Sequence, residues 1–84
     1  MAATYTLRIV SHEATIFDGQ VESLVAPGAM GSLGVLAHHA PLLTALRPGT
    51  VKVRDADGKN HEFSIQGGFL EVSDNQAVIL MHEA

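Results

Sequence analysis

The stretch VAPGAMGSLGVLAHHAPLLTAL, from Val25 to Leu46, poses the main question about the fold of this chain. It contains glycines at positions 28, 31 and 34, then two adjacent histidines, and no Asp, Glu, Lys or Arg. Glycine inside a regular element costs backbone entropy unless the chain needs a positive φ or a close approach there. We therefore expect this stretch to be neither a plain strand nor a helix, but a turn-rich and weakly polar contact surface.

Outside this stretch, apolar and polar residues alternate with a period of two. Such runs cover residues 5–9, 50–54 and 62–66, and the last run, 77–81, is apolar on both faces. Successive side chains of a strand point to opposite faces, so these runs predict strands, the last of them central in a sheet. Turn residues separate the runs, at Asp18-Gly19, Pro48-Gly49, Asp55–Asn60, Gly67-Gly68 and Asp74-Asn75. No stretch shows helical spacing, so we predict an all-β flattened sandwich or barrel of about ten short strands.

The length and charge of the chain limit the classes of protein to consider. Its 84 residues suit a single domain, residues 1–84, and its hydrophobic fraction of 46% suits a globular one. A net charge of −4, with the basic residues scattered, argues against a nucleic-acid surface. The N-terminus does not resemble a signal peptide, and the longest apolar run is far shorter than the ~20 residues that cross a bilayer. We expect any membrane association to depend on another protein.

No catalytic, metal or cofactor motif is complete in the sequence. Ser32 lies in Gly-Ser-Leu-Gly, which lacks the first spacer of a nucleophile elbow, and no helix follows it. His38 and His39 are adjacent, so on a strand they point to opposite faces and cannot easily share one ion. We expect one ring to be exposed and the other packed, with a ring nitrogen bonded to backbone. The run from Asp55 lacks the glycine and glutamate that a calcium loop needs at its sixth and twelfth positions.

Two binding functions remain open on this reading. Lys59 at the predicted hairpin tip would suit a biotinyl or lipoyl carrier domain, although its neighbours, Gly58 and Asn60, differ from the usual motifs. A sugar-binding sandwich would need exposed aromatic side chains for stacking. The four aromatic residues all occupy positions where we expect the core; they are Tyr5, Phe17, Phe63 and Phe69.

The order of several short motifs along the chain resembles the epsilon subunit of F-type ATP synthase, called delta in mitochondria. The resemblance is to its N-terminal β-sandwich and covers essentially the whole chain. The pairing of His39-Ala-Pro-Leu-Leu43 with a later Gly67-Gly-Phe-Leu-Glu-Val72 is specific. The other motifs are Ile9–Ser11, Ile16–Gly19, Val25–Gly28, Gly31–Val35 and Leu46–Gly49.

The resemblance implies a non-catalytic subunit of the central stalk, with no cofactor. It would bind the gamma subunit on one side and the polar loops of the membrane c-ring on the other, and so couple ion translocation to ATP synthesis. It would sit on the cytoplasmic side of a bacterial inner membrane, attached only through the complex.

Carried over by position, the ring-facing turn is Ala29, Met30, Gly31, Ser32 and Leu33, and the gamma side includes Ser11, His39 and Leu42. Many members of the family carry an acidic residue where Ser32 stands, which suits a basic residue on the ring loop, and many carry Pro-Gly where Ala37-His38 stands. Many also continue into a C-terminal helical hairpin after the sandwich. We expect this chain to be either a truncated or a naturally short member.

Overall fold

A computed structural model describes residues 3–82 and contains only strands as regular elements in that range. The strands are β1 (Tyr5–Val10), β2 (Thr15–Gly28), β3 (Gly31–Leu36), β4 (Leu42–Asp55), β5 (Asn60–Ser73) and β6 (Gln76–Met81). The prediction of an all-β sandwich or barrel is confirmed. The expected end of the chain at Glu83 and Ala84 lies outside the described residues, and no helix within residues 3–82 is long and apolar enough to cross a membrane.

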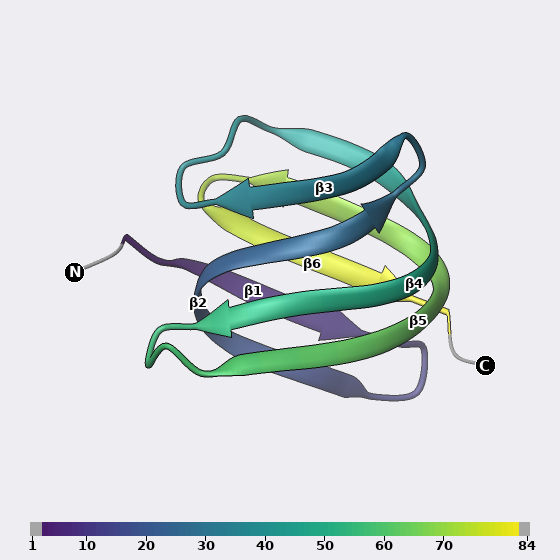
Figure 1. Cartoon of the computed structure of the whole chain (residues 1–84), viewed down its shortest axis with the longest axis horizontal. Helices are drawn as coiled ribbons and strands as arrows, with labels where there is room; N and C mark the ends of the chain where they lie inside the picture. Colours follow the sequence, from purple (N-terminus) through teal and green to yellow (C-terminus); the bar gives the residue numbers. More distant parts are fainter. Residues whose placement is uncertain (1–2, 83–84) are drawn as a thin grey trace.

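The strands form one sheet that curls into two facing layers. Their order is β1-β6-β5-β4-β2-β3, and an additional antiparallel pairing between β1 and β2 closes the barrel. β1 and β6 run parallel, with Leu7 beside Ala77 and Ile9 beside Ile79. The long strands β2, β4 and β5 curve from one layer into the other, whereas β3 lies alone at the outer edge, against β2 (Figure 1). β6 is flanked by β1 and β5, which confirms its predicted central position.

The strands are fewer and longer than predicted because several turn signals mark bends inside a strand. Gly19, Pro48-Gly49 and Gly67-Gly68 all lie within β2, β4 and β5, each of which is 14 residues long. At Gly68 a side chain is impossible, because a Cβ atom there would lie 2.0 Å from the Leu80 carbonyl oxygen. Gly67 and Gly68 also have φ values of 114° and 146°, which L-residues rarely adopt.

Two predicted turns are confirmed. Asp55–Asn60 forms the β4–β5 hairpin connection, and Asp74-Asn75 joins β5 to β6. Asp74 and Asn75 have φ values of 50° and 58°, the left-handed pair that a tight two-residue hairpin requires and that Asp and Asn tolerate.

The Val25–Leu46 stretch is more regular than we expected. Its two ends belong to β2 and β4, and its middle forms β3. Gly34 has open space around it and no left-handed φ, so that glycine reflects no local backbone requirement. Gly31, with a φ of 125°, does meet the expectation of an unusual backbone at the turn.

Among the described residues, the core lies between the two layers and is apolar apart from the Tyr5 hydroxyl and, at its edge, Ser11. Its largest fully buried side chains are Leu7, Ile9, Leu24, Ile65, Leu70 and Ile79. The expectation that all four aromatic residues are in the core is wrong for Phe69, which is 50% exposed. Phe69 faces outward because its neighbours Leu70 and Gly68 are the buried residues of that part of β5.

We predict opposite effects for alanine at two glycines of the sheet. Gly68→Ala forces a Cβ atom onto the Leu80 carbonyl and strains φ, so it should cost about 3 kcal/mol of unfolding free energy or more. For Gly34→Ala, the unfolding free energy should stay unchanged or rise by up to about 1 kcal/mol, because nothing occupies the space around Gly34. Urea denaturation of the two variants and the parent measures both, and equal stabilities would contradict the bend assigned to Gly68.

Candidate partner-binding site

The β2–β3 turn carries the most exposed large apolar side chain among residues 3–82. Met30 at its tip is 100% exposed, and Ala29 fixes the turn by donating its N–H to the Ala45 carbonyl at 3.1 Å. A Cβ atom at Gly28 would lie 2.8 Å from the Gly31 carbonyl oxygen, so this turn needs glycine at position 28. Of the predicted ring-side residues, Leu33 differs from the rest because it is half-buried and packs against the core.

Two hollows flank this turn. The larger, of about 250 Å³, is lined by residues 28–33 together with Leu42 and Thr44 of β4. The other, of about 240 Å³, places Arg47 and two prolines beside Ser32. Sequence reasoning did not select Arg47, because only the curvature of β4 brings it to the turn. The charge near the turn is therefore positive, and no described acidic residue forms an ion pair with Arg47.

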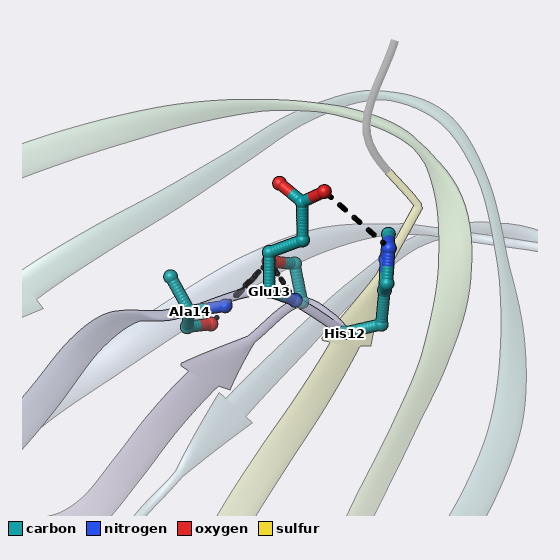
Figure 2. A network of polar contacts seen from close by, with 4 residues as sticks. His12, Glu13 and Ala14 are labelled. Atoms are coloured by element: carbon teal, nitrogen blue, oxygen red, sulfur yellow. Dashed lines mark hydrogen bonds and ion pairs between the residues drawn. The ribbon is translucent and has the colours of Figure 1, made fainter.

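Ser11, predicted on the gamma side, is committed to the local turn between β1 and β2. Its side chain is buried, and its hydroxyl accepts the N–H groups of Glu13 and Ala14 at 3.3 and 3.2 Å. Figure 2 shows the side chains of His12 and Glu13 reaching out from this turn. His12 Nε2 lies 3.6 Å from Glu13 Oε1 and both side chains are exposed, so they, and not Ser11, are the groups that a partner would meet here.

The predicted gamma-side residues do not form one cluster. Ser11 follows Val10, which pairs with Leu80 near the end of β6. His39 lies near the other end, where the N–H of His38 donates to the Asn75 side chain at 2.7 Å. Leu42 pairs with Val72 but lines the same hollow as the predicted ring-side turn. The assignment of each residue to a partner stays a prediction.

The two histidines behave as expected from the sequence. His38 is exposed, and His39 is half-buried with its Nδ1 atom 2.7 Å from the Ala40 carbonyl oxygen. The structure brings no three potential metal ligands together within residues 3–82.

The β4–β5 hairpin that carries Lys59 is held by a network around Asp55. The Asp55 carboxylate accepts the N–H groups of Asp57 and Lys59, both at 2.9 Å, and lies 2.8 Å from His61 Nε2. The bond to His61, with the backbone bond from Lys59, holds the pKa of the Asp55 carboxyl below its usual range. The hairpin is thus a well-braced loop with an exposed lysine.

Tyr5 anchors β3 to the rest of the barrel. Its hydroxyl donates to the Val35 carbonyl at 2.7 Å across the interior, and the side chain is buried. Burial raises the pKa of the Tyr5 phenol far above its usual value, although a bond from the Leu24 backbone opposes that shift. Because Leu24 and Val35 are paired across β2 and β3, this phenol joins β1 to the β2–β3 ladder.

We predict that Tyr5→Phe loosens the β2–β3 hairpin without unfolding the protein. Losing the buried hydrogen bond should cost about 1–2 kcal/mol, which lowers the melting temperature by roughly 4–16 °C in a domain of this size. Calorimetry measures that shift. An unchanged melting temperature would show that the Val35 carbonyl needs no phenol.

We predict that Asp55 contributes stability that depends on pH. Its folded-state pKa lies below the unfolded value, so the contribution is full above an unfolded pKa of about 3.9 and is lost as the pH falls through the folded value. His61→Phe should move the pKa of Asp55 upward, because it removes the largest cause of the shift. A carbon-detected NMR titration of Asp55 in both proteins decides this, and identical curves would contradict it.

Comparisons with known proteins agree on one family. The model of the ATP synthase delta/epsilon chain β-sandwich domain matches residues 4–84. The ATP synthase epsilon chain of Dichelobacter nodosus is 39% identical over 84 residues, which cover 100% of this chain and 59% of the relative. That of Desulforamulus reducens is 44% identical over 84 residues, which cover 100% and 63%. The chain therefore spans about three-fifths of the length of these relatives.

Solved structures support the same conclusion. A chain of the Euglena gracilis mitochondrial ATP synthase structure of OSCP, F1 and c-ring is 28% identical with a TM-score of 0.90, over 99% of this chain and 53% of that one. A chain of the Tetrahymena thermophila central stalk and c-ring structure shares the fold, with a TM-score of 0.79 at 21% identity, over 98% of this chain and 66% of that one. The chain therefore belongs to the delta/epsilon chain family of ATP synthase and forms its β-sandwich domain.

Proposed function

We propose that this protein is a non-catalytic subunit of the central stalk of an F-type ATP synthase. In this role it links the gamma subunit to the c-ring and so couples ion translocation to ATP synthesis. The observation that carries the proposal is the family match over residues 4–84, together with relatives that are named ATP synthase epsilon chains. The Euglena neighbour, taken from an assembly with F1 and a c-ring, supports the same partners.

The construction of the barrel suits a part that transmits torque. The β1–β2 pairing closes the sheet on itself, and the Tyr5 phenol ties the outlying β2–β3 hairpin to the opposite layer. Close-packed interiors have low compressibility, so such a body passes on a rotation with little deformation. Coupling between a ring and a shaft needs this stiffness and no chemistry.

We assign the exposed β2–β3 turn, residues 29–33, to the c-ring loops. Met30 presents an unbranched, adaptable side chain that is fully available to a partner. Ser32 supplies a hydrogen bond without a negative charge, and Arg47 adds a positive one nearby. This ring contact would then depend on apolar packing more than on attraction of a basic loop.

We assign gamma binding to the sides of the sandwich that carry His39 and Leu42 and, at the β1–β2 turn, Ser11 with its exposed neighbours. No cofactor and no nucleic acid belong to this function. The complex would hold the protein on the cytoplasmic side of a bacterial inner membrane.

Co-expression tests the proposal directly. The tagged chain should retain a gamma subunit and a c-ring from one related bacterial enzyme through affinity and size-exclusion chromatography. Failure to bind gamma at micromolar concentration would overturn the proposed function.

We predict that Met30→Ser weakens ring attachment and spares gamma binding. Covering a large apolar side chain is worth about 1.5–3 kcal/mol, so attachment should weaken at least about tenfold. The measurement is ring retention during purification, together with ATP-driven proton pumping in membrane vesicles. Leu80→Ser is the control, because Leu80 is also exposed, at 45%, but lies on β6 among residues assigned to neither partner. Loss of gamma instead of the ring would show that the two surfaces are assigned the wrong way round.

A further inference from the structure

Within residues 3–82, two strand edges of the barrel lack a neighbour, and an opening lies between them. β3 pairs with β2 on one side only. The first residues of β4 pair with β5, and the pairing of β2 with β4 extends no further toward them than Gly28 and Leu46. We call the opening between β3 residues 32–36 and β4 residues 42–45 the seam. The hollow of about 250 Å³ lies at the end of the seam next to the β2–β3 turn, and it is lined by residues 28–33 with Leu42 and Thr44.

Backbone groups on both sides of the seam point into it. Residues of an antiparallel pair alternate between those that bond the partner and those that face away. Pro27 has no N–H, so Pro27 and Ser32, which lie opposite each other, form a pair without hydrogen bonds between them. Ser32, Gly34 and Leu36 then direct their N–H and C=O groups away from β2. On the other side, the Ala45 carbonyl is already bonded to the Ala29 N–H, which shows that Ala45 directs its groups away from β5. By alternation, Leu43 directs its N–H and C=O groups to the same side, into the seam.

The β3 edge of the seam lacks the side chains and bulges that protect free strand edges. Soluble proteins usually block such an edge with a lysine, a proline or a bulge, and β3 has none of these. No Asp, Glu, Lys or Arg occurs from Val25 to Leu46. Two exposed leucines border the seam, Leu36 at 67% and Leu43 at 71%. An edge with this composition is suited to being covered in the working assembly.

We propose that the partner stalk chain adds an extended, uncharged strand to β3 in the seam; this inference rests on the proposed function. An extended strand fits because its backbone can satisfy the outward groups of Ser32, Gly34 and Leu36, whereas the backbone groups of a helix are already bonded within the helix. A segment without charge fits because the seam offers no counter-charge to a buried Lys or Glu. Apolar side chains on alternate residues would cover Leu36 and Leu43, which leaves the side chains of residues 29–33 to the c-ring.

The pairing has a signature that distinguishes it from side-chain docking. In complex with co-expressed gamma, amide exchange should slow at Ser32, Gly34 and Leu36 by ~10-fold or more. Leu33 and Val35, which pair with β2, should change little. Hydrogen exchange followed by NMR on the labelled chain, free and in complex with gamma, resolves this alternation.

A matched pair of variants tests the hydrogen bond at the centre of the edge. Gly34→Pro removes the outward N–H at an edge position where proline is tolerated, and should weaken gamma binding about tenfold or more. Gly34→Ala keeps the N–H and adds a methyl group into open space, so its affinity should stay within about twofold of the parent. The melting temperature of each variant shows whether it is folded, and the exchange pattern of the parent decides the matter if the proline variant is not.

The outcomes separate this inference from the proposed function. Gamma binding with no alternating protection in β3 overturns the inference and leaves the function standing. Protection that appears in the chain alone as its concentration rises assigns the seam to a second copy, and also overturns it. Absence of gamma binding overturns both.

Discussion

The close approach of Gly68 to the Leu80 carbonyl is the contact on which the architecture depends. At that point the backbone of β5 lies so near to β6 that no side chain fits between them. The bend allows β5, and β4 paired with it, to leave one layer and continue in the other. The apolar core exists because three curved strands each supply side chains to both layers.

The sequence was sufficient to predict the class of fold because alternation and turn chemistry are local. Asp74-Asn75 is predictable as a turn from its sequence because these side chains tolerate the left-handed backbone found there. Pro48-Gly49 and Gly67-Gly68 carry equally strong turn signals, yet they bend strands that continue. The difference lies in the neighbours: a Cβ atom at Gly49 would lie 3.1 Å from the Pro27 Cβ atom, so a residue far away in the chain limits the space at this bend. Local sequence cannot distinguish a bend from a break when a distant strand decides it.

The sequence predicts the part of the candidate site that is a single turn. It predicts less of the part that is formed by residues from different strands. Residues 29–33 are contiguous, so the turn they form was located from the sequence alone. Arg47 lies near Ser32 only because β4 curves toward the turn. Phe69 faces solvent only because its neighbours in β5 are the residues that face the core. Ser11 was selected by resemblance, but its hydroxyl is engaged in the β1–β2 turn. Such a residue can shape the surface presented to a partner through its exposed neighbours without contacting that partner itself.

The absence of charge from Val25 to Leu46 connects the turn, the hollow and the seam. A chain with 17% charged residues leaves its most exposed apolar side chain, its unprotected strand edge and its apolar hollow in one uncharged stretch. For a monomer in solution, that arrangement invites aggregation and brings no gain in core packing, because Met30, Leu36 and Leu43 contribute little to the core. Partners that cover the stretch remove this liability and turn the same surface into binding energy. The features that look least favourable in the isolated domain are thus those that an assembled rotor would use.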